Sequence, residues 1–272
     1  MMRHSLNLVL GGTIVVLIIA VAIIGSFWTP HDPLLIDYAH RLLPFTPTNP
    51  LGTDEFGRDV LSRLMAGASA SGVIAILTVT LAVVSGSVLG LATGYFGGWT
   101  DRVLMTFVNA LLSFPGILLA LALVAIFGAN RYGIVLALGL AYTPSVTRIV
   151  RSNVLAIRER DYVAASRTIG NSEVFTILRH VLPNCTAALI VLATSMFGWV
   201  LLAESALSFL GLGVAPPAPT WGNMLATARP YLTQSALLAV CPGLCISIAL
   251  LGINLLGDAL RDQLDPQMRG VR

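Results

Sequence analysis

Long apolar runs, separated by short stretches that contain charged residues, glycine or proline, account for most of this chain. A helix of about 20 apolar residues can cross the roughly 30 Å of hydrocarbon in a lipid bilayer. Runs of this kind occur near residues 6–28, 68–94, 102–127, 133–150, 186–208 and 236–257. The pattern predicts an all-α, polytopic membrane protein with six transmembrane helices. We divide it into 1–67, the first transmembrane helix with an outer loop, and 68–272, a membrane core of five helices.

The first apolar run follows Arg3 and His4, an arrangement that is also found in secretion signals. The run is longer than the roughly 7–15 residues of a signal core, and it contains no clear A-x-A cleavage site. We therefore interpret it as a first membrane helix that the protein retains.

Composition and charge agree with a membrane protein and predict its orientation. Only 11% of the 272 residues are charged and 56% are hydrophobic, whereas about a quarter of the residues in a soluble domain are charged. The formal net charge of +3 is too small and too dispersed for a nucleic-acid-binding surface. All 16 basic residues are arginines, and a cytoplasmic N-terminus places eleven of them on cytoplasmic segments and five opposite. Because cytoplasmic loops carry the excess positive charge, we expect an N-in, C-in orientation.

The outer loop, 29–67, is too long to be a simple turn. Asp54/Arg58 and Asp59/Arg63 are acid-before-base pairs at the i,i+4 spacing of a helix, and Thr53 or Asp54 can cap its start. The favoured interpretation is a capped surface helix that leads into the second span. Direct contact of this loop with a substrate is the alternative.

The inner loop, about 151–185, reads as two short helices broken at Gly170. Asn171 or Ser172 can cap the second helix, and Pro183 is expected to end it. Small residues in the first helix would let the backbone of another protein approach, while the surrounding arginines would meet acidic groups on that partner. The sequence therefore predicts a docking element on the cytoplasmic side. Its small residues are Ala164, Ala165 and Ser166.

This inner loop resembles the EAA loop of permease subunits of binding-protein-dependent ABC importers. The family pattern is E-A-A-x-x-x-G, followed further along by an aliphatic residue, leucine and proline. Ala165, Ser166, Gly170 and Val181-Leu182-Pro183 match it, whereas Ala164 stands where the family has glutamate and so removes a charge. The resemblance implies that the loop couples to an ATPase. Its coupling residues would be Ala164, Ala165, Ser166, Arg167, Gly170, Leu182 and Pro183.

Four further motifs, in the same order along the chain, resemble the dipeptide/oligopeptide/nickel branch of that family. They are 51–63 in the outer loop, 94–101, 208–222, and 257–266 near the C-terminus. The residues of the outer-loop motif are Gly52, Thr53, Asp54, Gly57, Arg58 and Asp59.

The resemblance implies a type I ABC importer permease fold in a bacterial inner membrane. It also implies that the chain works in a complex with other subunits. The partners would be a homologous second permease, two cytoplasmic ATPase subunits and an extracytoplasmic solute-binding protein. The chain has no GxxxxGK[ST] phosphate loop and no lysine to supply one, so ATP and magnesium would bind in the partner subunits, with no cofactor here and no enzymatic activity. A di- or oligopeptide is the first expectation for the cargo, and nickel or a metal chelate is the alternative.

Glu204 is the one acid that we place well inside a predicted span. An acid at such a depth faces a cavity or a partner in most membrane proteins, so Glu204 is a candidate for the translocation pathway. A structural hydrogen bond to nearby Ser or Asn side chains is the alternative. A function of a different class is a stand-alone secondary carrier that uses Glu204 as a proton or cation site. Such a carrier is expected to contain inverted repeats and broken helices at mid-membrane, which the sequence does not show.

Several other residues favour structural roles. The four histidines have no ligand spacing, so no metal site is expected. The three cysteines are interpreted as packing thiols. Gly86 and Gly90, with Gly94, form overlapping G-x-x-x-G patterns that favour close helix packing, within the chain or with a partner. The tryptophans Trp28, Trp99 and Trp221 are expected at the membrane interfaces.

Overall fold

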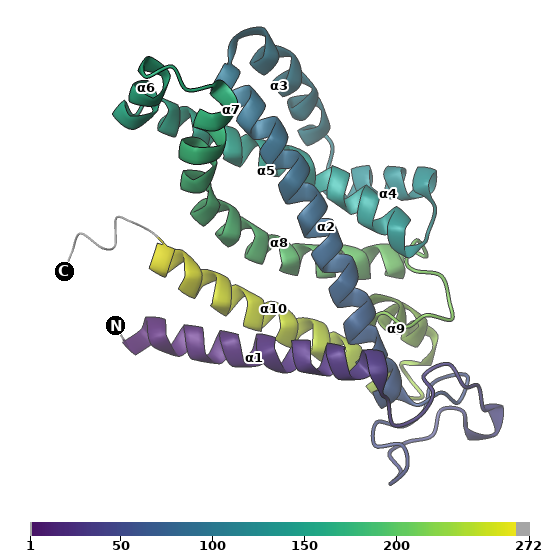
Figure 1. The fold of residues 1–272 in the computed structure, drawn as a ribbon. Helices are drawn as coiled ribbons and strands as arrows, with labels where there is room; N and C mark the ends of the chain where they lie inside the picture. The colour runs from purple at the N-terminus through teal and green to yellow at the C-terminus, as the bar shows by residue number, and fades with distance from the viewer. Residues whose placement is uncertain (1, 265–272) are drawn as a thin grey trace.

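The computed structural model describes residues 2–264 of the chain, with side chains for 6–263, and this part contains helices and loops but no strand. Five helices are long and apolar enough to cross a membrane, or six spans if a bent pair counts as one. The long helices are α1 (Met2–Phe27), α2 (Val60–Phe96), α5 (Arg131–Arg158), α8 (Leu182–Phe209) and α10 (Leu237–Leu264), as Figure 1 shows. The predicted all-α, multi-pass membrane fold is confirmed.

The third predicted span, 102–127, is not one straight helix. It consists of α3 (Gly98–Leu112) and α4 (Gly116–Phe127), which are bent by 95° relative to each other. The break occurs at Pro115, because proline lacks an N–H and disfavours helical backbone in the residue before it. At 1.5 Å per residue, α3 is about 22 Å long and α4 about 18 Å, so neither alone crosses the hydrocarbon layer.

The centre of the fold is the contact between α2 and α5, which glycines make possible. A Cβ on Gly86 would lie 2.5 Å from the Cβ of Val146, and a Cβ on Gly90 would lie 2.6 Å from that of Val150. One helical turn further, Gly94 repeats the contact against Val154. The predicted close-packing face is confirmed, and its partner is α5 of the same chain. Small residues let two helix backbones approach closely in a membrane, where the hydrophobic effect does not drive helices together.

The helix α1 packs on α10 and α2 along one side and is open on the other. A Cβ on Gly11 would lie 2.6 Å from the backbone nitrogen of Leu256, so the backbones of α1 and α10 nearly touch. Its remaining apolar side chains are largely exposed, for example Leu17 at 60% and Ile23 at 55%. Such a surface suits lipid or another membrane helix.

The two ends of the bundle carry different loops (Figure 1). Residues 28–59 join α1 to α2, and the short helix α9 (Trp221–Ala228) precedes α10. Trp221 binds α9 to α2: its Nε1 donates to the Leu64 carbonyl at 3.0 Å and its backbone nitrogen to Ser71 Oγ at 3.1 Å. We call the end of the bundle that holds residues 28–59 and α9 the α9 end. The opposite end holds α6 (Asp161–Thr168) and α7 (Glu173–Thr176), and we call it the coupling end after the role expected for its loop.

Trp221 is only 5% exposed, so its ring packs inside the protein and not against lipid. Its indole N–H needs an acceptor, and the Leu64 carbonyl inside the bundle provides it. The expected position of the three tryptophans near the membrane interfaces stays a prediction.

Candidate functional site

The loop at the coupling end has the predicted outline of two short helices that meet at Gly170. α6 ends at Thr168, and Gly170 has φ of +90°, a conformation that glycine adopts without strain. Ser172 is the residue that caps α7, since its Oγ accepts from the backbone nitrogen of Phe175 at 3.2 Å. Of the two capping residues predicted, the structure selects Ser172.

Side chains brace the turn from inside. Ser166 is buried, and its Oγ lies 3.0 Å from the Thr176 hydroxyl and accepts from Asn171 Nδ2 at 3.1 Å. Ala164 and Ala165, by contrast, are exposed on α6. Of the small residues proposed for docking, the two alanines therefore face outward and Ser166 holds the two helices together.

The sequence predicts that the second helix ends at Pro183, and this prediction is wrong. The five-residue π-helix Ile177–Val181 carries the chain from α7 into α8, and Pro183 lies in the first turn of α8. Pro183 therefore lies at the junction of the π-helix with α8 and does not end a helix. The wider turn is seen in the bond from the Leu182 nitrogen to the Ile177 carbonyl. The loop and α8 are consequently one continuous segment.

The loop exposes several large apolar side chains beside its charged ones. Ile169 is 80% exposed beside Gly170, and Val174, Phe175 and Leu178 are also exposed. Exposed apolar side chains on a helical protrusion make it a candidate surface for binding another protein.

An ion pair and a hydrogen bond that the sequence did not reveal hold the long helices together at the coupling end. Arg151 on α5 makes a two-bond pair with Asp101 on α3, at 2.6 and 2.7 Å. Arg158, at the end of α5, donates through Nη1 to the carbonyl of Gly94 on α2 at 3.0 Å. Each of these two arginines binds a neighbouring helix.

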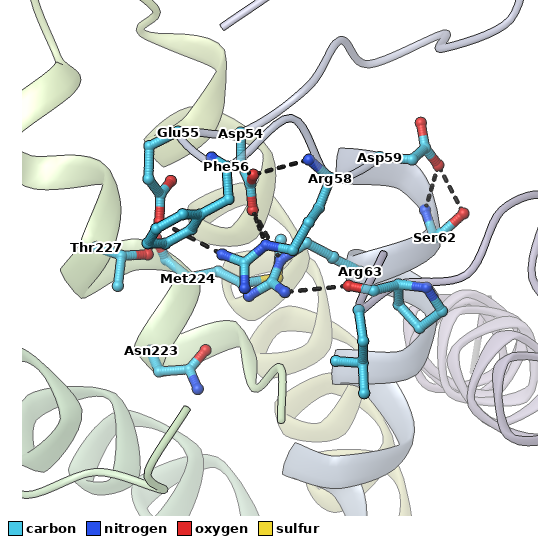
Figure 2. Close-up of polar contacts among 12 residues, drawn as sticks. Asp54, Glu55, Phe56, Arg58, Asp59, Ser62, Arg63, Asn223, Met224 and Thr227 are labelled. Atoms are coloured by element: carbon cyan, nitrogen blue, oxygen red, sulfur yellow. Dashed lines mark hydrogen bonds and ion pairs between the residues drawn. The ribbon is translucent and has the colours of Figure 1, made fainter. Parts of the chain in front are cut away.

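At the α9 end, the outer-loop motif forms a buried cluster of charges, shown in Figure 2. Asp54 accepts from Arg58 Nε at 2.6 Å and from the Arg58 backbone nitrogen at 2.9 Å, and Arg63 Nε lies 3.3 Å from the same carboxylate. Arg58 also reaches Glu55 Oε1 at 3.4 Å and covers the ring of Phe56. All four charged side chains in the cluster are less than 10% exposed.

The expected surface helix is therefore wrong. Residues 53–59 form a tight loop closed by an antiparallel bridge between Thr53 and Asp59, and the helix begins only at Val60. Asp59, rather than Thr53 or Asp54, caps α2 by accepting from the backbone nitrogen of Ser62 at 2.8 Å. Gly52 and Gly57 lie against the backbone of the preceding segment, where a Cβ would meet carbonyl oxygens. The i,i+4 spacing does pair Asp54 with Arg58, but Arg63 pairs with Asp54 and not with Asp59 as helical spacing predicts.

The cluster also joins the loop to the rest of the α9 end. Asp54, Glu55 and Arg63 line a narrow space together with Met224 and Thr227 of α9. Burial raises the pKa of Glu55 above its usual value. The arrangement is a scaffold that fixes the loop on α9 and the start of α2.

Glu204 lies on α8, beneath the start of α9, and is 1% exposed. Its Oε1 accepts from the hydroxyls of Thr220 at 2.8 Å and Ser208 at 3.0 Å, while Oε2 has no hydrogen-bond partner among the described residues. A Cβ on Gly222 would lie 2.7 Å from Oε2. The expected bonding to nearby serine is confirmed, with the N-cap threonine of α9 added. A role of Glu204 in the translocation pathway stays a prediction.

Within residues 6–263, no group of three His, Cys, Asp or Glu side chains is placed to hold a metal ion. The C-terminal motif is described only in part, since Asp265 and Pro266 lie outside the described residues, as do Arg269 and Arg272.

Comparison with known proteins finds relatives that match nearly the whole chain. The family model described as "Binding-protein-dependent transport system inner membrane component" matches residues 86–270. The glutathione transport system permease protein GsiD of Pectobacterium atrosepticum is 37% identical, over 96% of this chain and 87% of its own length. The dipeptide transport system permease protein DppC of Alkalihalophilus pseudofirmus is 37% identical, over 96% and 86%. The di/tripeptide transport system permease protein DppC of Pseudomonas aeruginosa is 39% identical, over 96% and 89%.

The fold is also similar to a solved structure, that of the MetNI methionine ABC transporter in an inward-facing conformation. The TM-score is 0.60 at 18% sequence identity, and the match covers 74% of this chain and 96% of the other. The resemblance predicted from the inner loop and the ordered motifs is thus confirmed. The chain belongs to the family of binding-protein-dependent transport system inner membrane components, as a multi-pass permease subunit of an ABC importer whose ATPase is a separate subunit.

Proposed function

We propose that this permease carries a di- or oligopeptide into the cell, received from an extracytoplasmic solute-binding protein. It pairs with a homologous second permease, and two cytoplasmic ATPase subunits bind ATP and magnesium. The support for the cargo is that the similar proteins are named for dipeptide, di/tripeptide and glutathione transport. The N-in, C-in orientation, which places the coupling end in the cytoplasm, is part of the proposal.

The observation that carries the proposed coupling is the exposed two-helix protrusion around Gly170. It joins α8 without a break, so a push on α6 and α7 would reach the membrane through a continuous helix. The exposed alanines of α6 would lie against the ATPase backbone, and Ile169 and Phe175 would cover apolar surface on it. Arg167, Leu182 and Pro183 belong to the same lever: Arg167 faces α2, and the other two begin α8.

Replacing Gly170 with valine is expected to uncouple ATP hydrolysis from uptake while the chain still inserts. No described atom lies within 4 Å of the Cβ position, so the substitution creates no clash. It does force a β-branched residue to a φ of +90°, at a cost on the order of 1–2 kcal/mol that moving α6 against α7 relieves. The measurement is uptake of a labelled dipeptide, and ATP hydrolysis, by the complete importer in liposomes.

Gly211→Val is the matched control for that experiment. Gly211 also has positive φ, +81°, and open space at its Cβ, but it lies toward the α9 end. Its ratio of uptake to hydrolysis should stay near that of the wild type. Normal coupling in Gly170→Val would contradict the proposal that the loop acts as a lever.

Two further outcomes bear on the cargo and the energy source. Uptake of a nickel chelate in place of peptide would support the alternative cargo. Uphill uptake by the purified chain alone would contradict the ATP-driven mechanism.

Glu204 is proposed to serve transport as a gating group at the α9 end, where its carboxylate holds the start of α9. Glu204→Gln keeps an oxygen that can accept from Thr220 and Ser208 but removes the charge and the second carboxylate oxygen. Uptake is expected to fall while the amount of permease in the membrane does not change. Asp32→Asn, at an exposed acid of the outer loop, is the control. Wild-type uptake by Glu204→Gln would remove the charge from the mechanism.

A further inference from the structure

A tyrosine in the last turn of α2 contacts the coupling loop. Tyr95 is 4% exposed, and its hydroxyl lies between Arg167 of α6 and Glu173 of α7. The hydroxyl donates to Glu173 Oε2 and accepts from Arg167 Nε at 3.2 Å. The Arg167 guanidinium also lies over the tyrosine ring, 4.7 Å from its centroid, and 3.6 Å from the Glu173 carboxylate. One phenol therefore joins both helices of the loop to α2.

The helix that Tyr95 ends is tightly packed against α5. The contacts of Gly90 with Val150 and of Gly94 with Val154 leave no space between the two helices. At the same end, Arg158 of α5 donates to the carbonyl of Gly94, next to Tyr95. A displacement that reaches Tyr95 would consequently move α2 and α5 together.

The loop has a second, different connection to the membrane helices. Its chain runs through the π-helical turn directly into α8. At its other end the loop follows α5 directly, after Glu159 and Arg160. Without a link to α2, motion of α6 and α7 would be transmitted along the chain to α5 and α8 only. With the link, α2 is moved by the same displacement, because two hydrogen bonds of the Tyr95 hydroxyl fix the loop to the end of α2. The ion pair between Arg167 and Glu173 holds α6 and α7 to each other.

We propose that the Tyr95 hydroxyl is a positioning group that ties α6 and α7 to α2, so that motion of the ATPase subunits reaches α2 directly, in addition to α5 and α8 through the chain. The inference rests on the proposed coupling function of the loop. Tyr95 does not contact cargo or nucleotide in this scheme, and its contribution is to transmit displacement.

The test is Tyr95→Phe in the complete importer, reconstituted in liposomes with both permeases, the ATPase subunits and the binding protein. Phenylalanine keeps the ring and its contact with Arg167 but loses the hydroxyl that bridges Arg167 and Glu173. Labelled dipeptide taken up per ATP hydrolysed is expected to fall several-fold, with the ATPase subunits still co-purifying. Tyr142→Phe, which removes a hydroxyl from the middle of α5, should leave that ratio at the wild-type value.

A double variant distinguishes a link from a general loss of stability. If the hydroxyl and the carboxylate act as one unit, Tyr95→Phe combined with Glu173→Ala should lower uptake per ATP no further than either change alone. An additive loss would overturn the link, and so would an unchanged ratio in Tyr95→Phe. A parallel fall of hydrolysis and uptake would show a merely structural role and would also overturn it.

Failure of the underlying coupling function would look different. Ile169→Arg places a charge on the exposed face of the loop, away from the Tyr95 contacts, and should reduce co-purification of the ATPase subunits. Undiminished co-purification in that variant would contradict the proposal that this face binds the ATPase subunits. The dipeptide taken up per ATP hydrolysed in Tyr95→Phe tests the link of α2 to the loop separately.

Discussion

Replacing Gly90 with leucine is expected to prevent the chain from accumulating as a folded membrane protein. A Cβ at this position would lie 2.6 Å from the Cβ of Val150 and 2.9 Å from the carbonyl oxygen of Thr147. Overpacking a filled core costs about 1–3 kcal/mol and occasionally more. The upper end of that range or beyond is expected here, because the clash is with the backbone and Cβ of another helix, which no rotation of a side chain relieves.

The measurement is the yield of monodisperse protein in detergent and the midpoint of its thermal unfolding. Gly72→Leu provides a matched control, since Gly72 lies on the same helix but no described atom is within 4 Å of its Cβ position. It also lines an apolar cavity of about 380 Å³ between α1, α2, α8 and α10, where a leucine side chain can be accommodated. Equal yield and stability of the two variants would contradict the close contact of α2 with α5.

Replacing Arg58 with methionine is expected to destabilise the α9 end by about 3–5 kcal/mol, the usual cost of removing one partner from a buried ion pair. Asp54 and Glu55 would keep their buried positions and lose the guanidinium that contacts both. Arg41→Met makes the same substitution in the same loop at an exposed arginine and should change stability by less than about 0.5 kcal/mol. Thermal unfolding in lipid nanodiscs measures both. Similar unfolding of the two variants would show that the charge cluster does not hold the loop.

The effect of Arg58→Met should depend on pH. Burial raises the pKa of Glu55, and Arg58 partly offsets this, so removing the arginine raises the pKa further. A carboxyl whose pKa is higher in the folded state contributes stability that is present below its unfolded pKa and is lost as the pH rises through its folded pKa. The difference in stability between variant and wild type should therefore narrow from about pH 7 to about pH 5. If the difference in stability stays constant over this pH interval, the inference that Arg58→Met leaves the Glu55 carboxylate without a compensating charge is contradicted.

The apolar pattern predicted most of the membrane helices because every span must be apolar enough to lie in the hydrocarbon of the bilayer. α2, α5 and α8 each contain one of the predicted runs, and α1 and α10 match theirs to within one residue at one end. The pattern failed at Pro115, where hydropathy stays high while the backbone bends. It also failed at Pro183, since a proline in the first turn of a helix and one that ends a helix look alike in sequence.

The candidate site was predictable where its signals were local. Gly170 and Ser172 are a turn glycine and a helix cap, and both act between residues close in the chain. The links of Tyr95 to Glu173 and of Arg151 to Asp101 join residues on different helices. Nothing in the spacing of such residues indicates that they will meet.

By itself, the sequence determined that the chain lies in a membrane, that a hinged two-helix loop interrupts its spans, and that its ordered motifs resemble an importer permease. These properties follow from transfer free energy and local backbone preference, which act on residues near one another. Only the tertiary structure decided that α5 covers the glycine face of α2, that the outer-loop charges are buried, and that Glu204 lies beneath α9. Those outcomes depend on which surfaces pack together. A buried charge is stable only beside its partner, and here α9 and the start of α2 close around the paired charges.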